Sequence, residues 1–117
     1  MIDTNNPLQK QPLPPINIGG RASSAIVAGM VPGARLVKAF NHHAFWNLAA
    51  EPGKEGGQRI LFYASDDVAA KAEVAELINR LGFFGIDMGD IETGSRLFQP
   101  PQGPLAGHNL VKMALQI

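Results

Sequence analysis

The stretch Arg59-Ile60-Leu61-Phe62-Tyr63-Ala64 decides the fold, because it is nearly continuous in apolar residues. Such a run is typical of a strand that is covered on both of its faces. A helical pattern follows over residues 66–81, and a short strand pattern follows that over residues 83–87. This order predicts a strand, a helix and a second strand joined by a right-handed parallel crossover.

The helix at 66–81 has the clearest pattern in the chain. One stripe at helical spacing is apolar, and its members are Ala70, Val74, Leu77, Ile78 and Leu81. Asp66 and Asp67 suit the positive end of the helix dipole, and Gly82 suits the position just after the last turn. These signals predict where the helix begins and ends.

The same reading extends to both sides of this unit. Ser23 or Ser24 can cap a helix that ends before Pro32-Gly33, and Leu36 to Phe40 forms another strand pattern. The remaining expectations are a mostly loop segment at 1–20, a short helix at 43–50, a loop at 94–107 and a final helix at about 107–115.

Together these elements predict an α/β fold. We expect a single domain over residues 1–117, in which 1–20 are mostly loop and 21–117 form the core. The expected architecture is a partial Rossmann-like three-layer domain with a small, mostly parallel sheet of about three strands. With 117 residues, 45% of them hydrophobic, the chain can bury a small core.

Composition excludes several classes of function. Ten basic residues balance ten acidic ones, which leaves no electrostatic footprint for nucleic acid or an anionic membrane. No segment reaches the roughly 20 apolar residues of a membrane span, and Met1 to Lys10 do not resemble a secretory signal. The absence of cysteine fits a reducing compartment, so we expect a cytoplasmic protein.

Asn41, His42 and His43 form the first candidate site, because they follow a strand at the edge where open α/β sheets bind ligands. Asn offers both a donor and an acceptor to a flat heterocycle. In the alternative interpretation, Asn41 caps the next helix and both histidines are exposed. A metal site built from His42, His43 and His108 is disfavoured, because adjacent histidines diverge and no ligand pair has helical spacing.

Other polar groups have simpler structural explanations. Asp66-Asp67 could be an acid–base pair but is more simply a partner of the helix dipole. Asp87 and Asp90 are expected to stabilise a turn. The segment 53–57 reads as a flexible surface turn, and no serine has the partners of a nucleophile. We therefore assign no catalytic residue.

Four blocks, which follow one another along the chain in the same order as in the family, carry a resemblance to a known family. They are Pro32-Gly33-Ala34-Arg35-Leu36-Val37-Lys38-Ala39-Phe40-Asn41, Ile2-Asp3-Thr4-Asn5-Asn6-Pro7-Leu8, Ser65-Asp66-Asp67 with Ala70-Lys71, and Leu81-Gly82-Phe83 with Ile86-Asp87-Met88-Gly89. They resemble the PGA-x-x-VKAFN, D-x-x-NP, GDD-x-x-AK and LGF-x-x-VD-x-G segments of the coenzyme F420-dependent NADP oxidoreductase family. The reductase domain of six-transmembrane metalloreductases carries related blocks. The resemblance is to the C-terminal half of this family, because the N-terminal Gly-rich half is absent.

The resemblance implies a site and its cofactors. In the family, Asn6-Pro7 would lie near the nicotinamide, and the segment from Lys38 to Asn41 near a deazaflavin or flavin ring. The implied cofactor-binding residues are Asn6, Pro7, Ala39, Phe40, Asn41 and His42, and the implied cofactors are NADP with F420 or flavin. The family's G-x-G-x-x-G loop is missing from this sequence, which leaves open the alternative that the chain alone binds none of these cofactors. His42-His43 also replaces the small residues that commonly follow the Asn.

The implied function is hydride transfer between NADP and a deazaflavin or flavin, by a chain that is not competent alone. A separate chain carrying the Gly-rich half would complete it. Two alternatives stay open: a non-catalytic, self-associating α/β domain, or a truncated product without a ligand. The open sheet edge predicts a homodimer.

Overall fold

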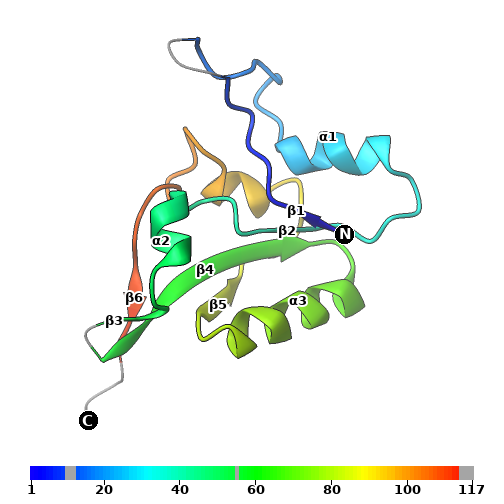
Figure 1. Ribbon diagram of the computed structural model, residues 1–117. Helices are drawn as coiled ribbons and strands as arrows, with labels where there is room; N and C mark the ends of the chain where they lie inside the picture. Colours follow the sequence, from blue (N-terminus) through cyan, green and yellow to red (C-terminus); the bar gives the residue numbers. More distant parts are fainter. Residues whose placement is uncertain (10–12, 55, 114–117) are drawn as a thin grey trace.

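The computed structural model describes residues 1–9, 13–54 and 56–113. Its elements, shown in Figure 1, follow the order β1 (Ile2–Asp3), α1 (Ser23–Met30), β2 (Val37–Ala39), α2 (Phe45–Ala49), β3 (Gly53–Lys54), β4 (Gly57–Ser65), α3 (Val68–Arg80), β5 (Phe84–Asp87), the 3₁₀ helix η1 (Ser95–Phe98) and β6 (Val111–Lys112). This is a small mixed α/β domain, compatible with a partial Rossmann-like fold, as the sequence predicts.

β4 is the central strand. It pairs antiparallel with β2 and parallel with β5 along its second half, and antiparallel with β3 and β6 at its beginning. β1 adds to the far side of β2 in parallel orientation, with Ile2 opposite Val37 and Asp3 opposite Lys38. The parallel pairing of β4 with β5 confirms the orientation expected for the strand–helix–strand unit.

α3 forms as the sequence predicts. Its buried positions are Ala70, Val74 and Ile78, all on the stripe that faces the sheet. The side chain of Asp67 accepts a hydrogen bond from the amide of Ala70 and so caps the first turn. Gly82 follows the helix with a φ of +93°, a conformation that favours glycine.

Two apolar clusters cover the two faces of the sheet. The cluster beneath α3 joins β2, β4, α3 and the following turn, and its buried members are Val37, Ala39, Leu61, Tyr63, Ala70, Val74, Ile78 and Phe83. On the opposite face Phe62 and Ala64 pack with Phe98 of η1. Figure 1 shows α3 on one side of the sheet and α1 with η1 on the other, which gives the three layers that we expected.

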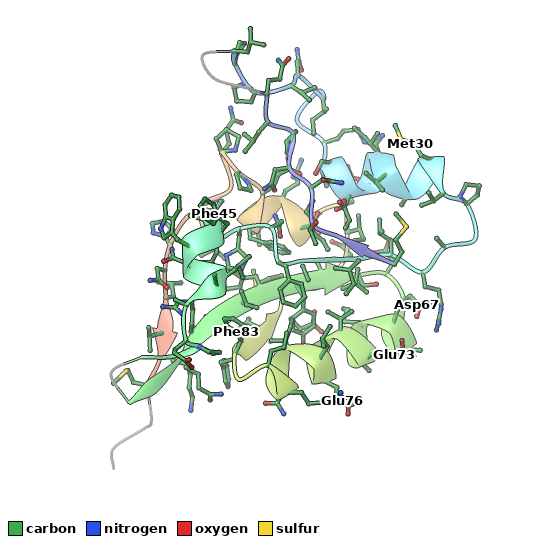
Figure 2. All side chains as sticks on the ribbon, in the orientation of Figure 1. Met30, Phe45, Asp67, Glu73, Glu76 and Phe83 are labelled. Atoms are coloured by element: carbon green, nitrogen blue, oxygen red, sulfur yellow. The ribbon has the colours of Figure 1, made fainter. Side chains whose placement is uncertain are left out.

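Figure 2 shows the same division at the level of side chains. Glu73 and Glu76 of α3 point away from the sheet, while Phe83 lies between this helix and the strands. Gly85 of β5 has a packing reason to be glycine: a Cβ at this position would lie 3.0 Å from Tyr63 Cε1 and 3.2 Å from Ile78 Cγ2.

Two expectations are wrong and a third is incomplete. We expected about three, mostly parallel strands, but within the described residues the sheet has six strands of mixed orientation, because β2, β3 and β6 all pair antiparallel with β4. The helix expected at 107–115 is absent over 107–113, where β6 instead supplies hydrogen-bond partners to β4, and residues 114–117 lie outside the described part. A turn occurs at Gly56, within the expected range 53–57, but the residues around it form a hairpin in which Gly53 pairs with Gln58. In each case sheet pairing overrides the local preference.

Candidate functional site

Asn6 and Asn41 meet where β1 and β2 end, because these two strands are parallel. Asn6 Nδ2 of the side-chain amide donates to the backbone carbonyl oxygen of Asn41 at 2.8 Å, and Asn41 Nδ2 donates to Asn6 Oδ1 at 3.1 Å. Asn41 also donates to the carbonyl oxygen of Phe98 at 3.2 Å. The two loops that follow the strands are thereby joined to each other and to η1.

The backbone turns sharply at Phe40. This residue has a φ of +62°, and it is the one described non-glycine residue with a positive φ. Such a conformation costs a bulky residue on the order of 1–2 kcal/mol. The half-buried ring packs against the α3-side cluster, which offsets this cost. The turn carries the chain from the buried strand residue Ala39 to Asn41.

His42 and His43 are both buried and their rings lie 4.3 Å apart. His42 Nε2 accepts a hydrogen bond of 3.0 Å from the amide of Phe62, so a neutral ring carries its proton on Nδ1. His43 Nε2 lies 2.9 Å from the carbonyl oxygen of Ile60, to which it donates, so its Nδ1 is an acceptor. The two rings therefore hold opposite tautomers.

Burial keeps both histidines neutral. Loss of hydration lowers the pKa of His42 from 6.5 to about 3, with a smaller contribution from neighbouring His43. The pKa of His43 is lowered as well, again chiefly by burial; the bond to Ile60 opposes this shift and the charge of Arg59 adds to it. Neither ring is a cation at neutral pH.

A hollow of about 330 Å³ lies beside these residues. We call it the ring hollow, and it is lined by Asn6, Leu8, Asn41, His42, His43, Ala44, Pro100, Pro101, Ala106 and Gly107. Asn41 Oδ1, His42 Nδ1 and His43 Nδ1 are buried and have no hydrogen-bond partner among the described residues. One donor and two acceptors are thus left unpaired on residues that line one hollow, which is unusual for buried groups.

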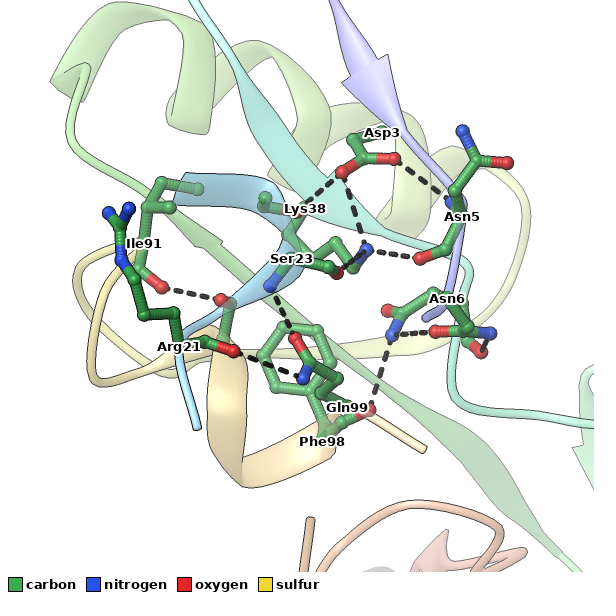
Figure 3. A network of polar contacts seen from close by, with 12 residues as sticks. Asp3, Asn5, Asn6, Arg21, Ser23, Lys38, Ile91, Phe98 and Gln99 are labelled. Carbon is green, nitrogen blue, oxygen red and sulfur yellow. Dashed lines mark hydrogen bonds and ion pairs between the residues drawn. The ribbon is translucent and has the colours of Figure 1, made fainter. Parts of the chain in front are cut away.

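A buried ion pair between β1 and β2 lies next to the site, at the centre of the network in Figure 3. Lys38 Nζ lies 3.3 Å from Asp3 Oδ2, and both side chains are almost completely inaccessible. The Lys38 ammonium also donates to the carbonyl oxygen of Asn5. Ser24 of α1 donates to Asp3 at 2.6 Å. This network fixes the loop after β1 against β2 and α1.

The two charges respond differently to burial. Burial by itself raises the pKa of Asp3, but hydrogen bonds from Ser24 and Asn5 and the charge of Lys38 outweigh it, so the pKa lies below its usual value. Burial lowers the pKa of Lys38, and Asp3 only partly restores it. The carboxylate is therefore held ionised by its partners.

The structure brings together three of the six residues implied by the resemblance. Asn6, Asn41 and His42 line the ring hollow, whereas Ala39 lies in the sheet and Phe40 in the core beneath it. Pro7 is buried and borders a different, larger hollow. The sequence reading did not place His43 in the cofactor-binding set, nor Asp3, Lys38 and Phe98.

The alternative interpretation of Asn41 and the histidines is wrong. The residue before α2 is Ala44, which makes no side-chain cap, and Asn41 bonds to Asn6 and Phe98 instead. The histidines are covered because β4 runs antiparallel to β2, so the beginning of β4 lies beside them. Spacing in the sequence does not reveal this orientation.

The acidic residues lie at the other end of β4. Asp66 accepts from the amide of Ile91, and Asp67 caps α3. Asp87 accepts from the amide of Gly89, and Asp90 from the amides of Thr93 and Gly94. They serve a helix start and turns, as the sequence predicts. Among the described residues no group of three metal-binding side chains occurs.

The ring hollow suits a flat heterocycle better than a metal or a phosphate. Its unpaired atoms are neutral and of both kinds, as needed to pair with the carbonyl and N–H groups of a redox ring. These atoms are covered, so a ring would reach them only if the walls of the hollow moved.

The described part of the chain has no helix that is long and apolar enough to cross a membrane.

Comparison with known proteins relates the chain to NADP-oxidoreductase-like proteins. It is 33% identical over 92 residues to Metalloreductase STEAP3 of Rattus norvegicus and 27% identical over 112 residues to Metalloreductase STEAP2 of Homo sapiens. These matches cover 78% and 90% of this chain but only 17% and 21% of the two relatives. No family model matches the chain.

Two solved structures resemble the fold. A hypothetical protein from Sinorhizobium meliloti superposes with a TM-score of 0.87 at 40% identity, over 95% of this chain and 54% of the other. A protein from Arthrobacter sp. FB24, named as a proposed F420-dependent NADP reductase, superposes with a TM-score of 0.63 at 32% identity, over 77% and 43%. The chain thus spans about half or less of each protein that it resembles.

Proposed function

We propose that this chain supplies the ring-binding side of an NADP-dependent oxidoreductase that transfers hydride between NADP and a deazaflavin or flavin. The observation that carries the proposal is the ring hollow, where Asn41, His42 and His43 leave buried polar atoms without partners. The F420 and NADP named for the Arthrobacter structure, and the metalloreductases, support the same class of reaction.

In this proposal the chain binds and orients, and the cofactor supplies the redox chemistry. The Nδ1–H group of His42 would donate to a ring carbonyl, and Asn41 Oδ1 would accept from a ring N–H. Burial disfavours protonation and so keeps both imidazoles neutral. A neutral imidazole has one donor and one acceptor, as this role requires. Asn6 would fix the orientation of Asn41 through their two mutual hydrogen bonds.

The phosphates of NADP need a different binding element. The sequence contains no G-x-G-x-x-G loop that could hold a pyrophosphate at a helix start. We therefore propose that this chain resembles the later part of a dinucleotide-binding domain, and that a Gly-rich part outside the given sequence completes it. The absence of cysteine supports function in a reducing compartment such as the cytoplasm.

Riboflavin titration tests the ring-binding role, because riboflavin carries the flat ring without a phosphate. We expect saturable quenching of riboflavin fluorescence by the purified chain. Asn41→Asp keeps Oδ1 but loses the NH2 group that donates to Asn6 Oδ1 and to the carbonyl oxygen of Phe98. The acceptor is then no longer held in place and the hollow gains a negative charge, so this variant should abolish the binding. Asn79→Asp is the matched control, because Asn79 is exposed on α3. This variant should bind riboflavin as the parent chain does. Equal binding by both variants would refute the assignment.

NADPH titration tests the dependence on a Gly-rich part. We expect no saturable NADPH binding by the chain alone, because the sequence contains no Gly-rich loop to hold the pyrophosphate at a helix start. Tight binding of NADPH to the isolated chain would show that the phosphate-holding part is dispensable. Such a result would overturn this part of the proposal and leave the riboflavin result untouched.

The open edge of the sheet supports self-association, which is also the basis of the alternative function as a non-catalytic domain. Met1 and Ile2 are exposed at this edge, beside a second hollow of about 330 Å³ that is bordered by Val37, Val74 and Leu77. We propose that a second copy covers this edge. Light scattering should show a dimer at micromolar concentration, and a stable monomer would contradict it.

A further inference from the structure

A larger hollow lies apart from the ring hollow. Its volume is about 520 Å³, and it is built from three segments, namely the loop before α1, the residues around η1 and the proline-rich loop that follows. Its lining shares only Pro100 and Pro101 with the ring hollow. Pro7 is the one residue of this lining that the resemblance places near the nicotinamide, and the proposed hydride transfer uses no other part of this hollow.

The charged groups that line the hollow all have one sign. Arg21 and Arg96 line it, and none of its lining residues is Asp or Glu. Arg96 Nη1 donates to the carbonyl oxygen of Gly20 at 2.8 Å, and the guanidinium has no acidic partner within the described ranges. The remaining donors of this planar group can bind both oxygens of a carboxylate or phosphate.

The second arginine is only weakly engaged. Arg21 lies 3.4 Å from Glu92, and both side chains are about half exposed. An exposed ion pair of this kind contributes little to stability and is readily exchanged. The side chain of Gln99 holds the backbone of Arg21 in place (Figure 3). Gln99 Nε2 donates to the carbonyl oxygen of Arg21, and Gln99 Oε1 accepts from the backbone amide of Ser23.

The walls of the hollow are stiff and partly apolar. Pro7, Pro15, Pro100, Pro101 and Pro104 line it, and proline rings restrict the backbone. Ile16 and Leu97 also line it, and both are more than a third exposed. The amide side chains of Asn17 and Gln102 complete a polar rim. Such a site is largely formed before a ligand arrives.

We propose that this hollow is a second binding site, for a small anion that has an apolar body. The carboxylate or phosphate group would bind Arg96 and Arg21, and the apolar body would pack on the prolines, Ile16 and Leu97. The sign of the charge follows from the two arginines and the lack of acidic lining residues. The apolar body follows from the proline-rich walls.

Phenyl phosphate, benzoate and inorganic phosphate are the probes for this proposal. Each is titrated into the full chain, and backbone amide shifts are followed by NMR. We expect saturable shifts at Gly20, Arg21, Gln99 and Gly103, with phenyl phosphate binding more tightly than inorganic phosphate. Benzoate compared with phenyl phosphate then shows which anionic group the arginines prefer.

Three variants make the test specific. Arg96→Gln should weaken phenyl phosphate binding about tenfold or more, since it removes a charged hydrogen-bonding group. Arg96→Lys should fall in between, because it keeps the charge but loses the planar pair of donors. Arg80→Gln, at an exposed position on α3, is the control and should leave binding unchanged.

Several results would overturn the proposal. They are a lack of saturable shifts with every probe, unchanged binding in a folded Arg96→Gln variant, or equal affinities for phenyl phosphate and inorganic phosphate. Riboflavin binding at the ring hollow should be the same in Arg96→Gln and the parent chain, because the arginine does not line that hollow.

Discussion

The α3 side of the sheet and the loop ends of β1 and β2 are buried by different means. Beneath α3 the buried side chains are almost all apolar, and helical spacing places them on one face. At the strand ends the buried groups include Asp3, Lys38, Asn41 and His42. The first region is held by the hydrophobic effect, and the second by hydrogen bonds and one ion pair.

The structural features that destabilise the fold lie at the strand ends and not on the α3 side. Buried polar atoms without partners and a positive φ at Phe40 both destabilise a fold. Both occur at the strand ends, beside the ring hollow. Such costs cluster at binding sites, and the α3 side supplies the stability that offsets them.

The largest effect is expected when the buried ion pair loses one partner. Lys38→Met should lower the free energy of unfolding by about 3–5 kcal/mol, because Asp3 is left buried without its countercharge. Urea denaturation measures this loss. The double variant Asp3→Asn with Lys38→Met should recover most of it, and failure to recover would show that packing of the lysine stem matters more than charge.

On the α3 side, a cavity should have a comparable but simpler effect. Ile78 is fully buried in the cluster beneath α3, so Ile78→Ala should cost about 2–5 kcal/mol. Leu81→Ala, at the half-exposed end of the helix, should cost about 1 kcal/mol or less. If urea denaturation gave equal losses for the two variants, the packing described for α3 would be wrong.

Acid should weaken the strand ends before it affects the α3 side. The folded chain holds the pKa of His42 at about 3, whereas an unfolded histidine titrates near 6.5. The unfolded state therefore binds more protons in this window, and stability falls as the pH falls from 6.5, by at most about 1.4 kcal/mol per pH unit from His42. The lowered pKa of His43 acts in the same direction.

Urea denaturation at a series of pH values from about 7.5 to about 4 measures this dependence. This range begins above the pKa of an unfolded histidine and ends above the folded pKa of His42. His42→Asn removes one of the two titrating rings and should reduce the slope of the profile, whatever it does to the absolute stability. Asp3 contributes mainly at the acid end of this range and below it, because the unfolded carboxyl binds protons as the pH approaches 3.8 while the folded pKa lies lower. A profile of unchanged slope in His42→Asn would contradict the buried, neutral ring.

The smallest expected effect belongs to the start of α3. Asp67→Ala removes the bond to the amide of Ala70 and should cost about 1 kcal/mol. Asp67→Asn keeps an acceptor at the same place and should cost less. Thermal or urea unfolding of the pair checks this order, and a larger loss with Asn than with Ala would contradict the capping role.

The sequence predicts the α3 side closely, because periodicity reports burial directly. The apolar stripe of Ala70, Val74 and Ile78 is found in the structure, and Asp67, which we expected only to suit the helix dipole, also caps the first turn with its side chain. The strand pattern at 59–64 is likewise confirmed as part of β4. In these elements local preference and packing agree.

The strand ends are harder to predict, because pairing between distant segments decides them. Nothing local indicates that β4 runs antiparallel to β2 and so covers His42 and His43. The ion pair joins Asp3 to Lys38, which are 35 residues apart. The resemblance to a family pointed to Asn6 and Asn41, yet their mutual hydrogen bonds depend on the parallel pairing of β1 and β2.

The central claim is that the polar strand ends form a ring-binding site, and mapping the contact surface of riboflavin by backbone amide NMR tests it most directly. We expect saturable shifts at Asn6, Asn41, His42 and His43, with little change along α3. Shifts confined to the hollow of Arg21 and Arg96, or a complete lack of saturable shifts, would contradict the account.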